Sequence, residues 1–215
     1  MNAIRLIKWV LVIIGAISTY YMVLLQAQYG ITSKIISEMI TPTLHPKAME
    51  KVYMPMANVL LDTGDLAMAS VVKMPIADDV SNEDVEEAME SIAVERGIRS
   101  VGMLPLSEMV ELQTNPQGVT KGHSDFKRQR FLKIYQYCAP RVAMTMVDHS
   151  DAFSAYLPCR IAIIEDKQGK RWLYSLDMNA MIYGGAKLPD GLREKALAVQ
   201  ETMLAIQSGG AEGDF

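Results

Sequence analysis

The residues from Trp9 to Leu25 form a run of seventeen without a charged side chain. A helix needs about 20 mostly apolar residues to cross a bilayer, and residues 4–27 supply them if Arg5 and Lys8 extend their charged ends to the headgroups. Basic residues concentrate on the cytoplasmic side of a span, and none follows this run until Lys34. The sequence therefore predicts a single transmembrane helix with a cytoplasmic N-terminus.

A cleaved signal peptide is the alternative, because it has the same basic start and apolar middle. Cleavage requires small residues at fixed positions, and both candidate sites are poor. The site at 16–18 leaves too short an apolar region, and the site at 25–27 places the bulky Leu25 where a small residue is needed. We therefore expect an uncleaved, single-pass anchor in a bacterial inner membrane, with the C-terminal domain in the periplasm.

The charge of the chain excludes two classes of partner. Without Arg5 and Lys8, 19 of the 21 basic residues remain against 25 acidic ones, which leaves a net charge near −6 outside the membrane. Nucleic-acid binding needs a basic face, and docking on anionic lipid needs basic clusters. We therefore expect no nucleic-acid partner and a soluble acidic domain.

The span carries a pattern that favours contact with other helices. Gly15 and Thr19 are small residues one turn apart, and the hydroxyls of Ser18, Thr19 and Tyr20 are available to bond across a helix interface. The alternative is that the hydroxyls bond to carbonyls of their own helix. The sequence predicts contacts with other membrane-protein subunits through this helix and through the segment 31–58.

The rest of the chain predicts an α+β fold in which an antiparallel sheet has helices packed on one face. We expect an anchor over 1–29, an amphipathic helix with a Pro-containing connector over 30–59, an α+β domain over 60–208 and a flexible tail over 209–215. Periodicity predicts strands over 66–74, 98–104, 130–137, 157–165 and 170–176, and helices over 31–41, 81–97, 140–147 and 191–207. The turn 166–169 ends in Gly169, so the last two strands are expected to form a hairpin. Ser81 is a good N-cap residue ahead of the apolar stripe of the helix 81–97. The polar stretch 105–129 is expected to be a loop with one helical turn.

Two short motifs resemble a known family. Tyr137-Cys-Ala-Pro140 is followed by a predicted short helix and then by Leu157-Pro-Cys-Arg160 at the start of a strand. This order is similar to the family catalogued as domain of unknown function 302, whose members show Cys-Asn-Pro and then Leu-Pro-Cys. The resemblance is clearest over 130–207. It implies a TATA-binding-protein-like α+β domain and no established activity, and the chain departs from it at Ala139, where Asn is usual.

Cys138 and Cys159 are the two cysteines of the chain. The first ends a predicted strand and the second nearly begins another, so the pair lies on neighbouring strands if those strands pair. Three alternatives stay open: two buried small residues, a disulfide, which an oxidising compartment permits, or a reactive or metal-binding pair. Neither cysteine belongs to a C-x-x-C motif, which argues against thioredoxin-type chemistry.

Sixteen methionines exceed ordinary usage. Thioethers are soft ligands that suit Cu(I), and Met144 and Met146 with His149 form one group of candidate ligands. Met54 with Met56 and Met178 with Met181 form two further groups. The alternative is that methionine fills gaps in the core, and residues two apart on a helix do not converge. Apart from this copper alternative, no cofactor is expected.

No catalytic pattern stands out in the sequence. The histidines, His45, His123 and His149, are far apart and predicted to be solvated, and Gly184-Gly185 is typical of a turn. The sequence therefore favours a non-catalytic accessory subunit that presents a periplasmic domain on a larger membrane complex, with energy conversion as the expected setting. The alternative is a membrane-tethered module that binds thiols, sulfur species or copper through Cys138 and Cys159.

Overall fold

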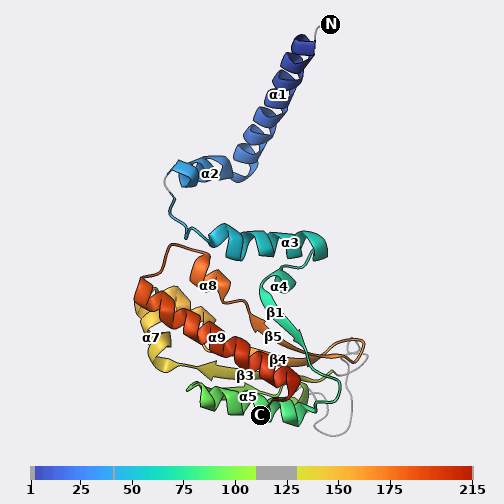
Figure 1. The fold of residues 1–215 in the computed structure, drawn as a ribbon, viewed down its shortest axis with the longest axis vertical. Helices are drawn as coiled ribbons and strands as arrows, with labels where there is room; N and C mark the ends of the chain where they lie inside the picture. Colours follow the sequence, from blue (N-terminus) through green and yellow to red (C-terminus); the bar gives the residue numbers. More distant parts are fainter. Residues whose placement is uncertain (1–2, 41, 110–129, 215) are drawn as a thin grey trace.

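The computed structural model describes residues 3–40, 42–109 and 130–214 (Figure 1). The chain begins with α1 (Ala3–Tyr29). Over Arg5–Tyr29 this helix is long and apolar enough to cross a membrane, by length and composition, and none of it is buried by the rest of the chain. The domain that follows therefore does not cover the apolar surface of α1.

A sharp corner separates α1 from α2 (Ile31–Ile40). Gly30 adopts a positive φ of 61°, which glycine tolerates and other residues rarely do. The Thr32 hydroxyl donates to the Met22 carbonyl at 3.2 Å, and the Ser33 N–H donates to the Gln26 side chain at 3.1 Å. The predicted helix 31–41 thus neither continues α1 nor packs on the domain, and the side chains of Ile35, Ile36, Met39 and Ile40 are exposed.

The segment 41–58 was expected to be a stiff connector, and this expectation is wrong from residue 49 onward. A π-helix, η1 (Met49–Tyr53), leads directly into α3 (Met54–Thr63). Pro55 lies in the first turn of α3, where its missing N–H removes no helical hydrogen bond. The domain boundary predicted between residues 59 and 60 falls inside α3.

The strand predicted over 66–74 is wrong in its first half. Residues Leu66–Ala69 form α4, a helical turn that begins after Asp65. The Asp65 carboxylate accepts hydrogen bonds from the N–H groups of Ala67 and Met68, so it satisfies donors that a helix start leaves free. The strand therefore begins only at Val71.

Five antiparallel strands form one sheet in the order β1-β5-β4-β3-β2. Their bounds are β1 (Val71–Pro75), β2 (Arg99–Leu104), β3 (Leu132–Cys138), β4 (Cys159–Glu165) and β5 (Arg171–Leu176). β4 and β5 form the predicted hairpin, with Gly169 at a φ of 86° in its turn. Residues 106–109 are helical, and residues 110–129 of the predicted loop lie outside the described residues.

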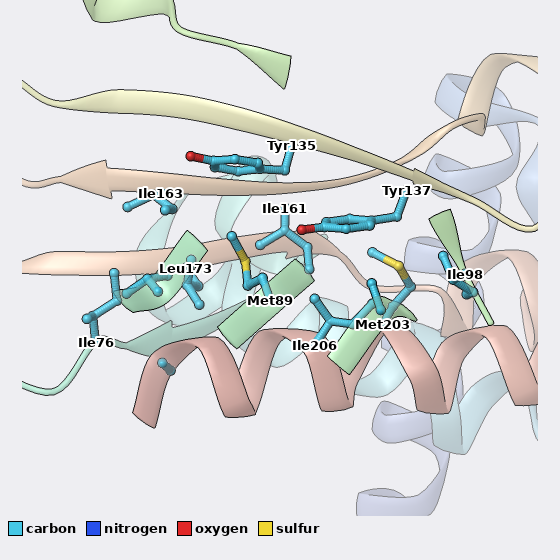
Figure 2. Packing of buried hydrophobic residues seen from close by; sticks show 13 residues of the cluster. Ile76, Met89, Ile98, Tyr135, Tyr137, Ile161, Ile163, Leu173, Met203 and Ile206 are labelled. Atoms are coloured by element: carbon cyan, nitrogen blue, oxygen red, sulfur yellow. The ribbon is translucent and has the colours of Figure 1, made fainter. Parts of the chain in front are cut away.

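Two helices, α5 (Asn82–Glu95) and α9 (Asp190–Glu212), cover one face of the sheet, which confirms the α+β prediction. Ser81 starts α5 through a capping box with Asp84. Figure 2 shows the side chains of Met203 and Ile206 on the helix side of the core and Tyr137 on the sheet side. Tyr137 is 1% exposed, and these side chains belong to the main core.

The C-terminal segment 209–215 was expected to be a flexible tail, but α9 continues to Glu212. A buried polar side chain fixes this part of the helix to the sheet. Gln207 is 0% exposed, accepts a hydrogen bond from the Ser175 hydroxyl at 2.6 Å and donates to the carbonyls of Leu173 and Val72 at 3.0 and 3.2 Å. Because an unpaired buried amide is costly, this network requires α9 to stay docked.

A second, smaller core lies where α9 begins. It is built from α7 (Pro140–His149), the 3-10 helix η2 (Asp151–Tyr156) and α8 (Asn179–Tyr183) against the N-terminal part of α9. Its buried residues are Met146, Ile182, Leu188, Leu192 and Ala196. Figure 1 shows α7 and α8 at this end of the domain.

The segment before α3 is fixed to this smaller core. The His45 N–H donates to the Gly185 carbonyl at 2.8 Å, and the Tyr53 hydroxyl donates to the Gly184 carbonyl. The His45 ring lies edge-on to Tyr183 with centroids 5.0 Å apart and is only 5% exposed. The expectation that His45 is a solvated surface residue is therefore wrong, because aromatic and backbone contacts bury it.

Candidate functional site

A cavity of about 40 Å³ lies between the main core and the smaller core. Its walls come from the end of β3, the start of β4, and the helices α7, α8 and α9. The lining residues are Tyr137, Cys138, Ala139, Val142, Ala143, Met146, Phe153, Leu157, Cys159, Met178, Met181, Ile182, Ala196 and Val199. A cavity of this volume has room for water, but the lining is apolar and offers water no hydrogen-bond partners. The geometry therefore suits an apolar or soft ligand.

The two predicted cysteines flank this cavity from adjacent strands. β3 ends at Cys138 and β4 begins at Cys159, and the two strands pair antiparallel with Tyr137 directly opposite Cys159. Cys138 is therefore one residue out of register with Cys159, yet both residues line the same cavity. Both are free thiols. The prediction that they lie on adjacent strands is confirmed.

The environment of the two thiols raises the pKa of each. Burial raises the pKa of Cys159, and the neighbouring Cys138 raises it further. Burial also raises the pKa of Cys138. Since the thiolate is the nucleophile, neither group is activated for covalent chemistry by its surroundings. The arrangement thus argues against a reactive thiol pair and leaves ligand binding open.

Three methionines join Cys159 around the cavity. Met146 reaches it from α7, Met178 directly precedes α8, and Met181 lies one turn further along α8. Spacing of three residues places Met178 and Met181 on one side of a helical turn. The sequence showed that spacing, but not that Met146 and Cys159 come to the same place, because pairing of distant segments leaves no local pattern.

The other metal candidates do not reach the cavity. Met144 is 60% exposed on α7, as expected for a residue two positions from Met146. His149 is exposed and lies beside the Phe153 ring, with centroids 6.3 Å apart. His123 falls outside the described residues. Among the residues that the structure describes, no three His, Cys, Asp or Glu side chains form a group able to hold a metal ion.

The predicted contact residues of the span lie on an open helix surface. A Cβ added to Gly15 would meet nothing within 4 Å. The Thr19 hydroxyl donates to the Gly15 carbonyl at 2.9 Å, so it is satisfied within its own helix. Tyr20 packs edge-on against Tyr21. Ser18 lies on the same face as Gly15, three residues away.

The chain departs from the family pattern at the residue before Pro140. Ala139 is the N-cap residue of α7, and no side chain caps this helix. Asn, the residue usual in the resembling family, is among the best N-caps because its side-chain oxygen accepts a hydrogen bond from the first turn. The departure therefore leaves the start of α7 without a side-chain cap.

We expect the substitution Ala139→Asn to stabilise the chain by about 1 kcal/mol through this missing cap. Thermal unfolding followed by circular dichroism measures the change. Ala139→Val, which adds volume without an acceptor, is the matched control and is expected to give no gain. An equal gain from both substitutions would show that filling space, and not capping, is responsible.

Residues 72–208 match the family described as "Domain of unknown function DUF302". A similar solved structure is the crystal structure of an uncharacterized conserved DUF302 protein from Bacillus stearothermophilus. It has 13% sequence identity and a TM-score of 0.47, and the likeness covers 65% of this chain and 96% of the other. No curated protein matches the chain at a significant level.

Proposed function

We propose that this chain, which belongs to the DUF302 family, functions as a non-catalytic, membrane-anchored accessory subunit of a larger membrane complex. The observation that carries the proposal is α1, whose 25-residue apolar stretch Arg5–Tyr29 is 0% buried within the chain. An apolar helix without internal support needs lipid or another helix around it. The DUF302 description assigns no activity, so the proposal rests on the chain itself.

The anchor and the folded domain have separate surfaces, which supports a presenting function. α1 and α2 contact each other through the corner at Gly30, while the domain folds around its own buried core. Gly15 leaves open space on the span, and small residues of this kind allow another helix backbone to approach closely. We therefore propose a transmembrane helix of another subunit as the partner at this position.

The exposed residues after the span offer a second contact. Ile35, Ile36, Met39 and Ile40 are all 45% exposed or more. They lie within one helix that starts directly after the corner at Gly30, so the geometry keeps them close to the outer end of the span. We propose that this apolar side of α2 contacts the outer surface of the same complex.

The arrangement predicts the compartment of the C-terminus. Arg5 and Lys8 precede the span, and no basic residue lies between Leu25 and Lys34, so we propose a cytoplasmic N-terminus and a periplasmic domain in a bacterial inner membrane. A reporter that is active only in the cytoplasm, fused after Phe215, should be silent. The same reporter fused after a second, added span should be active, and activity of the first fusion would refute the topology.

The partner is tested by extraction in mild detergent. The full chain, tagged at its C-terminus and expressed at its native level, is expected to co-purify with at least one other integral membrane protein. The matched control is a chain in which residues 1–29 are replaced by an unrelated single span of equal length. Co-purification of the same protein with both chains would show that the contact is made by α2 or the domain and not by α1.

A further inference from the structure

We propose that the cavity between the two cores is a Cu(I) site whose ligands are the Cys159 thiolate and the thioethers of Met146, Met178 and Met181. This site goes beyond the proposed accessory function and does not depend on it. The four sulfur-bearing side chains line the same cavity of about 40 Å³. They come from β4, α7 and the start of α8, so the meeting of these three segments is a property of the tertiary structure.

The chemical character of the lining selects the metal. Thioethers and thiolates are soft donors that prefer Cu(I), whereas carboxylates and imidazoles suit harder ions. Within the described residues no group of three His, Cys, Asp or Glu gathers, so the cavity has no donor set for Zn²⁺, Ca²⁺ or Mg²⁺. A soft, monovalent ion fits the donors that the cavity provides.

Charge balance points to the same ion. Among the described residues no charged side chain lines the cavity, and an uncompensated charge in an apolar site is strongly disfavoured. One Cu(I) with one thiolate and neutral thioethers has a net charge of zero. A divalent ion with the same ligands would leave one positive charge without compensation.

The donors have the freedom and access that binding requires. Cys159, Met178 and Met181 are partly exposed, so an ion does not have to cross a closed core. Methionine has three rotatable bonds and adapts its sulfur position readily. The start of β4 holds Cys159 in place by pairing with β3, so the methionines adjust around a fixed thiolate.

Binding involves one ligand exchange and no redox change. The Cys159 sulfur loses its proton to solvent and forms a bond to copper, which arrives and stays as Cu(I). A coordinated thiol is deprotonated by the metal itself, so the raised pKa of the free thiol does not prevent binding. Cys138 also lines the cavity, but Tyr137 and not Cys138 lies directly opposite Cys159 in the sheet, so Cys138 is not included among the proposed ligands.

The test uses the full reduced chain in detergent, titrated anaerobically with Cu(I) against a chromogenic Cu(I) chelator. We expect one equivalent of copper per chain and an X-ray absorption spectrum with sulfur scatterers alone. Cys159→Ser and the double substitution Met178→Leu with Met181→Leu should each lower the affinity at least about tenfold, which corresponds to about 1.4 kcal/mol. Leucine has nearly the volume of methionine and is well tolerated in cores.

The matched control is Met144→Leu on the same helix as Met146, since Met144 is exposed and does not line the cavity. Its affinity should equal that of the unchanged chain. Failure of the unchanged chain to retain copper would overturn the proposal, as would nitrogen or oxygen scatterers at the metal. Equal affinities for Cys159→Ser and Met144→Leu would also overturn it, because the thiolate would then play no part.

Discussion

The chain carrying Gly15→Leu is expected to insert into the membrane normally and to lose its partner subunit, with co-purification reduced about tenfold or more. Small residues let two helix backbones approach closely, and their packing contacts hold helices together in lipid. A Cβ on Gly15 has no neighbour within 4 Å among the described residues beyond its own helix backbone and chain neighbours. We therefore expect the added bulk to act on another molecule.

The control for this substitution is Ala16→Leu. Neighbouring residues on a helix are separated by about 100° around its axis, so this variant adds similar bulk on a different face. Leucine favours insertion, so both variants should reach the membrane in equal amounts. Partner retention by Gly15→Leu at the level of Ala16→Leu would show that the span is only an anchor and that association depends on the segment 31–58 or on the domain.

Gly210→Val is expected to lower the free energy of unfolding by about 3 kcal/mol, at the upper end of the usual range for overpacking. A Cβ on Gly210 would lie 2.5 Å from the Cγ of Met89 and 3.5 Å from the Cδ1 of Leu173. Both neighbours are 0% exposed in the main core. They have no space to move into, so α9 would have to shift away from the sheet.

Gly191→Val, in the same helix, is the matched control. A Cβ at position 191 would meet nothing within 4 Å, so only the helix preference of the new residue changes, an effect below about 1 kcal/mol. Denaturant unfolding of the full chain in detergent, followed by far-ultraviolet circular dichroism, measures both variants. Equal free energies of unfolding would contradict the close contact between α9 and α5.

The elements with strong local signals were predicted well. Ser81 and Asp84 form a capping box, and the apolar stripe behind them predicted the helix that the structure shows as Asn82–Glu95. The turn ending at Gly169 predicted the hairpin of β4 and β5. Short-range contacts determine the structure of these segments, so the local sequence pattern is enough to predict them.

The segments that the sequence predicted wrongly have structures determined by distant contacts. Gly209 and Gly210 resemble a fraying end, yet their small size lets α9 approach Ile92 and Met89 of α5. His45 is buried because Tyr183 and the carbonyl of Gly185 happen to lie next to it. Neither partner is visible from the neighbouring sequence, so composition alone favoured a tail and a solvated residue.

At the cavity, too, the sequence predicted what local patterns determine and missed what distant contacts determine. The sequence placed Cys138 and Cys159 on adjacent strands, and the pairing of β3 with β4 confirms this. It grouped Met146 with Met144, whereas the fold brings Met146 to Cys159 and leaves Met144 exposed. Local spacing found the candidate sulfur atoms, and only tertiary packing selected which of them meet.

Native mass spectrometry of the particle extracted from its own membrane tests the central proposal most directly. The full chain, tagged at its C-terminus and expressed at its native level, should be released as a particle that contains at least one different membrane protein in fixed stoichiometry. The open surface of α1 requires such a partner if it serves as more than an anchor. A particle that contains only copies of this chain and lipid would contradict the accessory-subunit proposal.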